Sequence, residues 1–144
     1  MTLDDIRKMI IEDIDMDKTE LDVEAIKTPQ LHNKYLNILT DEKILLASYS
    51  DSYKVLRKKK WLYYTGKMSE DELKDEGWEP FPLNLLKQDI DKFLDSDEDL
   101  ILSRRKIKYQ EEKVNYLEGI IKMIINRQWL IREAIDWIKF TNGT

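Results

Sequence analysis

The most regular hydrophobic pattern of the chain lies in its last third, where aliphatic residues recur with helical spacing. If Ile107 is taken as position a of a heptad, eight of the ten a and d positions up to residue 138 are aliphatic. They are Ile107, Val114, Leu117, Ile121, Ile124, Ile131, Ile135 and Ile138. The pattern predicts one long helix that begins near Ser96–Asp99, where acids favour a helix N-terminus, and ends at Asn142–Gly143.

This apolar stripe is wider than a single neighbouring helix can cover, because the flanking c and g positions are also apolar. These positions hold Tyr109, Tyr116, Ile120, Met123, Leu130, Ala134 and Trp137. β-Branched residues at both a and d favour assemblies larger than dimers. Two interpretations stay open: the helix packs only against the first half of its own chain, or it also packs against copies of the chain. The second is favoured, since two long helices leave much apolar surface uncovered.

The first half of the chain also predicts helices. Thr2 and Asp5 resemble a weak capping box, and the apolar residues after them keep helical spacing to about Ile14. Asp17 and Thr19 can cap a short helix.

That short helix is expected over Leu21 to Lys27, followed by a longer one that starts at Thr28-Pro29, because Thr caps well and Pro is tolerated in a first turn. No helix breaker follows until Gly66, which suits a C-terminal cap. The longer helix has about 37 residues and a length of roughly 55 Å.

Residues 68–97 are expected to connect the two long helices. Ser69 and Glu72 form a short capping box, and a short helix can form over residues 83–94 after the Pro80–Pro82 break. With four Gly and three Pro, the chain lacks the turn residues of a β-sandwich. We therefore predict an all-α, elongated protein with two long helices that assembles into a ring-like homo-oligomer. Its single domain, residues 1–144, divides into N-terminal helices (1–67), a connector (68–97) and a C-terminal oligomerisation helix (98–144).

Composition limits the cellular compartments in which the protein is expected. The chain has no cysteine, which excludes disulfides and thiolate metal sites and fits a reducing compartment. The N-terminus lacks the layout of a signal peptide, and no stretch reaches the roughly 18 apolar residues of a membrane span. We expect a soluble protein that does not enter a membrane.

Charge is segregated along the chain. Its net charge is -5, yet residues 54–67, called the basic segment below, hold six basic residues and no acid. In a helix its cations and aromatic rings share a face, and this combination binds single-stranded DNA through phosphate contacts and base stacking. The candidate DNA-binding residues are Lys54, Arg57, Lys58, Lys59, Lys60, Trp61, Tyr63, Tyr64 and Lys67. Considered alone, such a charge run is more often a solvated face whose Trp and Tyr belong to the core.

No constellation of residues supports catalysis. Asp95, Asp97 and Asp99 imitate the opening of a calcium loop, but Leu100 and Lys106 stand where that loop needs Gly and Glu. The single histidine has no Ser-His-Asp set around it in the sequence, and no phosphate-binding glycine loop occurs. We expect no enzymatic activity, no metal and no cofactor.

The segment Lys58-x-Lys60-x-x-Tyr63-Tyr64-x-Gly66 joins cations, paired aromatics and a helix stop at fixed spacing. Through it, and without a gap from Met1 to about Lys67, the chain resembles the UvsY-type recombination mediator proteins of T4-like phages. The resemblance implies that Lys58 and Lys60 bind single-stranded DNA, and it implies a ring of about six or seven chains. It further implies contacts with the phage single-strand binding protein and the phage recombinase, in the host cytoplasm. The chain departs from the family by also carrying Arg57, Lys59 and Trp61.

The expected function is that of a recombination mediator. Such a protein binds single-stranded DNA and promotes loading of the recombinase onto strand covered by single-strand binding protein, in homologous recombination, recombination-dependent replication and repair. The alternative is a non-catalytic helical oligomeric adaptor whose basic segment docks an acidic protein partner. If the heptad positions are the assembly surface, Ile124→Asp should break the oligomer.

Overall fold

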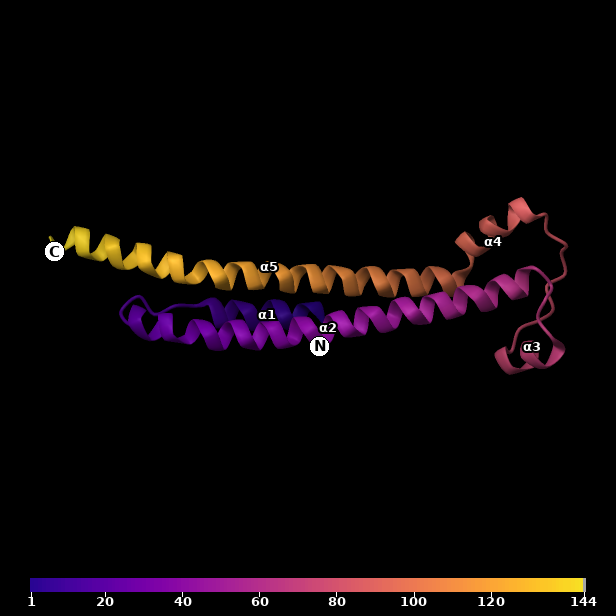
Figure 1. Cartoon of the computed structure of the whole chain (residues 1–144), viewed down its shortest axis with the longest axis horizontal. Coiled ribbons are helices and arrows are strands. Elements are labelled where there is room, and N and C mark those ends of the chain that lie inside the picture. The colour runs from indigo at the N-terminus through magenta and orange to yellow at the C-terminus, as the bar shows by residue number, and fades with distance from the viewer. Residues whose placement is uncertain (144) are drawn as a thin grey trace. The chain divides into compact units, whose positions relative to one another are not determined.

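The computed structural model describes residues 1–143, over which it has helices and no strands (Figure 1). In chain order the elements are α1 (Leu3–Ile14), α2 (Leu21–Tyr64), α3 (Glu70–Glu76), the 3-10 turn η1 (Lys87–Asp89), α4 (Ile90–Ser96) and α5 (Glu98–Thr141). The all-α prediction is confirmed, as are the two long helices, since α2 and α5 have 44 residues each. None of the helices in the described range combines the length and the apolar content of a membrane span.

Several predicted helix ends are present with their caps. Thr2 and Asp5 form the capping box of α1, because the Asp5 N–H donates to Thr2 Oγ1 at 3.1 Å and the Thr2 N–H donates to Asp5 Oδ2 at 2.8 Å. Gly66, in the left-handed conformation with φ 70°, ends α2. The Gly66 N–H donates to the Tyr63 carbonyl and the Lys67 N–H to the Leu62 carbonyl, which is the Schellman arrangement.

The prediction of a separate helix starting at Pro29 is wrong. α2 runs without interruption from Leu21 to Tyr64 and contains Pro29 in its interior. Proline has no N–H to offer the Ala25 carbonyl, which weakens the helix locally. The side chains on either side of the proline are held by packing, since Glu24 and Tyr35 are both buried, and such packing outweighs a local stop signal.

The connector contains a short helix in each half, separated by a stretch without regular structure. Ser69 accepts the Glu72 N–H at 3.2 Å and starts α3, as predicted. The helix expected over residues 83–94 begins later, because residues 83–86 are not helical and α4 starts only at Ile90.

The chain forms two compact units that are described separately. The terminal unit combines Met1–Lys43 with Glu112–Thr144, and the central unit comprises Ile44–Glu111. In the terminal unit, α1 lies beside the first part of α2, where Lys34 and Tyr35 both bond to Asp13 at 2.7 Å (Figure 1). Its core consists of Ile6, Ile10, Tyr35, Leu39, Val114, Leu117, Ile120, Ile124 and Ile131.

Two buried ion pairs join α2 to α5 inside the terminal unit. Arg127 Nη2 lies 2.6 Å from Glu24 Oε2, and Lys113 Nζ lies 3.2 Å from Glu42 Oε2. Removing one partner of such a pair leaves an uncompensated buried charge, so these contacts fix the register of the two helices.

Candidate nucleic-acid interface

The basic segment forms the last turns of α2 and the turn that follows, in the central unit. The most deeply buried apolar side chains of the central unit are Leu94 and Leu100, at 1% and 0% exposure. Around them the structure divides the nine predicted DNA-binding residues into two groups. Five of them form hydrogen bonds, ion pairs or ring contacts with the acidic connector or the start of α5, and the other four form none with these segments within residues 1–143.

Lys60 is buried although it carries a charge. Its Nζ lies 2.8 Å from Asp99 Oδ2, 3.2 Å from Asp97 Oδ2 and 4.1 Å from the centroid of the Trp78 ring. Burial alone would lower the pKa of the Lys60 ammonium, but the hydrogen bonds to Asp99 and Asp97 outweigh it and raise that pKa. In this conformation Lys60 holds α2 to the start of α5 and does not offer its charge to solvent.

Tyr64 lies one turn further along α2 and contacts the same carboxylate. Its hydroxyl donates to Asp97 Oδ2 at 2.6 Å, while Asp97 Oδ1 accepts the Leu100 N–H at 3.0 Å. Burial first, and then this hydrogen bond, raise the pKa of the Tyr64 phenol. Burial would also raise the pKa of Asp97, but the hydrogen bonds from Tyr64, the Leu100 N–H and Lys60 outweigh it and lower that pKa. Asp97 is therefore a carboxylate that caps α5 and binds α2 at once.

Tyr63 and Tyr64 also belong to an aromatic cluster with the connector. The Tyr64 ring centroid lies 5.0 Å from that of Phe81 and 5.6 Å from that of Phe93, and the Tyr63 centroid lies 5.4 Å from that of Trp78. The Tyr63 hydroxyl donates to the Glu79 carbonyl at 2.6 Å. Rings that pack on one another in this way leave little free face for stacking on a base. The two tyrosines thus contribute to the core of the central unit.

Two more cations of the basic segment lie near acids of the connector. Lys59 Nζ is 2.8 Å from Glu76 Oε1, and Arg57 Nη2 is 3.9 Å from Asp91 Oδ1. Both cations are about half exposed. Exposed pairs of this kind contribute little to stability and weaken with salt, so a phosphate can replace the carboxylate at small cost.

Lys54, Lys58, Trp61 and Lys67 make up the open face of the basic segment. Spacings of four and three residues place the first three on one side of α2. Trp61 is 36% exposed, and Lys67 Nζ lies 4.6 Å from the centroid of its ring. Across residues 1–143, neither Lys54 nor Lys58 forms an ion pair with an acidic side chain.

Sequence reasoning missed the acidic partners of the basic segment, although the acids themselves are visible in the connector. It also did not include the cations of α5 in the central unit among the DNA-binding residues. Lys106 Nζ lies 4.2 Å from the centroid of the Tyr49 ring, and Arg104 donates to the Asp95 carbonyl at 2.7 Å. The run of basic residues that contains Arg104 and Lys106 can be seen in the sequence. The contacts that these residues make with other helices cannot be read from it.

The predicted oligomerisation residues lie mostly inside their own chain. Val114, Leu117, Ile124 and Ile131 are buried in the terminal unit, while Ile121 and Ile135 there, and Ile107 in the central unit, are half-buried. Of the eight, Ile138 alone is exposed, at 42%. Ile124→Asp therefore tests the fold of the terminal unit before it tests assembly.

Exposed apolar side chains gather instead on the last turns of α5. Trp129, Trp137, Ile138 and Phe140 are exposed, and the Trp137 and Phe140 rings stack with centroids 5.9 Å apart. In the terminal unit this end of α5 extends past the turn between α1 and α2 (Figure 1). We call these four residues the C-terminal apolar surface.

Comparison with known proteins gives consistent results. A family model described as recombination, repair and ssDNA binding protein UvsY matches residues 9–144. The chain is 24% identical over 143 residues to the recombination protein UvsY of enterobacteria phage T4, covering 99% of each chain. Two crystal structures of the bacteriophage T4 recombination mediator protein UvsY are similar with a TM-score of 0.85. The lattice type IV structure has 23% identity over 97% of this chain and 99% of that chain, and lattice type II has 24% identity over 99% of both.

Proposed function

Because the chain belongs to the UvsY family of recombination, repair and single-stranded DNA binding proteins, we propose that it is a recombination mediator that binds single-stranded DNA through the open face of its basic segment. In the host cytoplasm it promotes loading of the phage recombinase onto strand covered by the phage single-strand binding protein. This activity serves homologous recombination, recombination-dependent replication and repair.

The observation that carries this proposal is the composition of the open face. Lys54 and Lys58 offer charges that no protein carboxylate neutralises within the described residues, and Trp61 offers part of an aromatic face beside Lys67. Phosphate neutralisation and base stacking are the two interactions that single-strand binding requires, and neither depends on base sequence. Arg57 and Lys59 form exposed pairs that a bound strand can recruit.

Lys60, Tyr63 and Tyr64 take a different part in the proposed site. Through Asp97 and the aromatic cluster they fix the end of α2 against the connector. Their contribution to DNA binding is therefore to position the open face, and contact with the strand is secondary.

The proposed active form is a homo-oligomer of about six or seven chains, in which several open faces act on one strand. Once a strand is bound to one open face, the other open faces of the oligomer are at a high effective concentration. The overall affinity therefore exceeds that of a single face, if one strand can reach several of them. By bending the strand over several faces, the oligomer weakens the hold of the single-strand binding protein and favours the form that the recombinase binds.

The double variant Lys54→Ala/Lys58→Ala tests the interface. Each lost phosphate contact should reduce the slope of log affinity against log salt by about 0.7, so the slope should fall by about 1.4 and affinity should drop at low salt. Lys8→Ala/Lys122→Ala removes two exposed cations outside the basic segment and should leave both quantities near wild type. Fluorescence anisotropy with a labelled oligonucleotide measures them. An unchanged slope in the double variant would place the strand elsewhere.

Loading is tested on strand covered by single-strand binding protein. Wild-type protein should shorten the lag before the recombinase hydrolyses ATP, and Lys54→Ala/Lys58→Ala should lose most of that effect. An adaptor that only docks proteins would keep the effect in the variant. An unchanged lag with wild-type protein would contradict the mediator proposal.

A further inference from the structure

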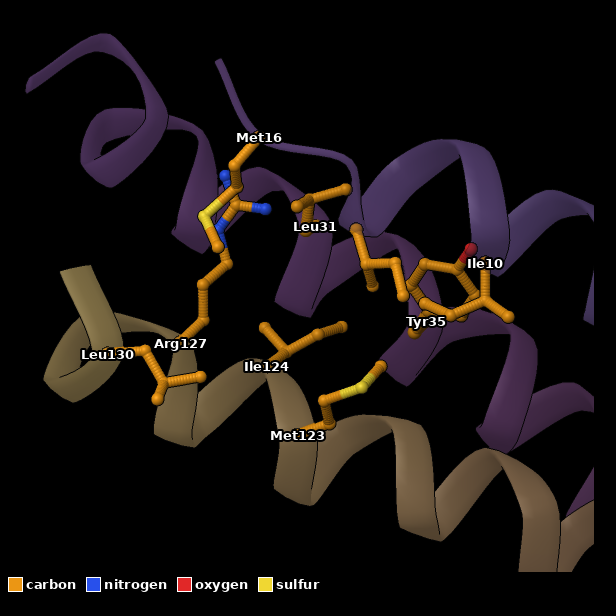
Figure 2. Close-up of a pocket in the computed structure, with 9 residues that line it drawn as sticks. Ile10, Met16, Leu31, Tyr35, Met123, Ile124, Arg127 and Leu130 are labelled. Carbon is orange, nitrogen blue, oxygen red and sulfur yellow. The ribbon is translucent and has the colours of Figure 1, made fainter. Parts of the chain in front are cut away.

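The terminal unit contains a cavity of about 170 Å³ that has no part in the proposed function (Figure 2). Its walls come from the end of α1 and the turn after it, from α2 and from α5, and they are apolar side chains such as Ile10, Leu31 and Ile124. The Tyr35 ring is part of the wall, while its hydroxyl is engaged by Asp13. One charged side chain, Arg127, completes the lining.

Arg127 is buried but only partly satisfied. Its side chain is 5% exposed, and its Nη2 donates to Glu24 Oε2 at 2.6 Å and to the Glu24 carbonyl at 3.0 Å. Nε and Nη1 of the same guanidinium are buried, and no atom of the described residues accepts a hydrogen bond from them. In Figure 2 the side chain rises from α5 toward Met16 and Leu31, along the cavity wall. Buried donors without an acceptor are costly, so an acceptor that reaches them gains affinity.

Charge balance at the cavity favours an anion. Glu24 is shared between Arg127 and the half-exposed Lys27, whose Nζ lies 3.0 Å from Glu24 Oε1. These three groups together carry one net positive charge. Asp13, which accepts a hydrogen bond from Tyr35 of the cavity wall, is already paired with Lys34 at 2.7 Å. A single carboxylate at Arg127 therefore makes the group neutral, whereas a cation would add to an existing charge.

We propose that this cavity is a binding site for a small carboxylic acid with an aromatic or branched apolar body, whose carboxylate accepts hydrogen bonds from Arg127. Cavities of about 150 Å³ with apolar walls bind benzene, so a single ring fits the available volume. Met16 and Met123 adapt the walls to ligands of different shape, because unbranched thioether side chains repack readily. The site is independent of the basic segment, and its test does not involve DNA.

Phenylacetate, its neutral isostere phenylacetamide, and toluene are the probes. Each is titrated into the full-length wild-type protein while the methyl signals of Met16 and Met123 are followed by NMR. All three bodies fit the cavity, but only phenylacetate brings a charged acceptor, so it should bind about tenfold or more tightly than the amide. Equal affinity for the acid and the amide, or no shift of either methyl signal by phenylacetate, overturns the proposal.

A pair of variants assigns the preference to Arg127. Arg127→Met is combined with Glu24→Gln so that no unpaired charge stays buried, and the double variant should bind acid and amide alike. Lys122→Met removes an exposed cation from the same helix and should keep the wild-type preference for the acid. A double variant that folds and still prefers the acid contradicts the assignment. The comparison of acid with amide on wild-type protein decides the proposal even if the double variant does not fold.

Discussion

Lys58 and Lys60 stand two positions apart in α2, and the helix turns them to different surroundings. Lys58 is exposed, whereas Lys60 is 7% exposed and bridges Asp97 and Asp99. The sequence predicted one role for both cations. It could not separate them, because the carboxylates that hold Lys60 come from a segment more than 30 residues away. Burial and pairing thus place two residues of identical chemistry in different surroundings.

Asp97→Asn should change the pH dependence of stability. The lowered pKa of Asp97 means that its contribution is present above the ordinary carboxyl pKa of 3.8 and is lost as pH falls through the lower folded-state value. At neutral pH the variant should lose about 1 to 3 kcal/mol of unfolding free energy, because the charge opposite Lys60 is removed. Its stability should then fall less steeply than that of wild type between pH 4 and pH 2, within about two units of the ordinary pKa. Urea denaturation across this range measures both effects.

Asp95→Asn is the matched control for this experiment. It removes a carboxylate from an exposed residue two positions earlier, and it should follow the wild-type curve. If the two variants behave alike, the effect is one of net charge and Asp97 has no special part in holding α2.

At the scale of elements, the ends of helices were predicted better than their interiors. Capping depends on two or three neighbouring residues, so the helix ends at Thr2, Gly66 and Ser69 could be predicted from the sequence. Pro29 led to the prediction of a helix start that is absent from the structure, where α2 continues through the proline. The helix continues there because of buried contacts of the terminal unit. One of them is the ion pair between Glu24 and Arg127, which are 103 residues apart in the sequence, so no local pattern can predict it.

Two glycines should respond to alanine in opposite directions. Gly66 has φ 70°, and a Cβ there meets nothing within 4 Å, so Gly66→Ala isolates the strain of the left-handed backbone and should cost about 1 kcal/mol. Gly119 lies inside α5, where a Cβ also meets nothing within 4 Å. Gly119→Ala should add up to about 1 kcal/mol through helix propensity.

The two glycine variants serve as controls for each other when thermal unfolding is followed by circular dichroism. A shift of both midpoints in the same direction would mean that backbone conformation is not what distinguishes the two sites.

For the whole molecule, the sequence predicted the apolar stripe of α5 correctly, but it did not predict which helices cover that stripe. The wide apolar stripe is present, but Val114, Leu117, Ile124 and Ile131 are buried in the core of the terminal unit of their own chain. Periodicity identifies which residues are buried, and it does not identify the partner that buries them. The C-terminal apolar surface, with two exposed tryptophans, is one candidate for contacts between chains.

If that surface closes a ring, Ile138→Asp and Trp129→Asp should each prevent assembly. Nine residues of helix separate the two side chains, which places them on opposite sides of α5, at 42% and 61% exposure, so one can face each neighbour. Each interface of a ring joins two different surfaces, so each variant keeps one intact side. An equimolar mixture should then stop at dimers, whereas each variant alone should stay monomeric in sedimentation velocity.

Asn115→Asp adds the same charge at an exposed polar position of α5 and should assemble as wild type does. A mixture that sediments as full-size oligomers, or as monomers only, would exclude this two-sided use of the C-terminal apolar surface.

The division of the chain between the two units has a consequence for its synthesis. The central unit is one continuous stretch, Ile44–Glu111, whereas the terminal unit needs both ends of the chain. As the protein leaves the ribosome, the central unit can therefore close while α1 and the first part of α2 still wait for their partner. Leu117, Ile124 and Ile131, which bury Ile6, Ile10 and Tyr35 as one core, emerge among the last residues. A chain that ended at residue 111 and was released from the ribosome would hold a folded middle and an uncovered apolar N-terminus, the state in which chaperones are expected to bind it.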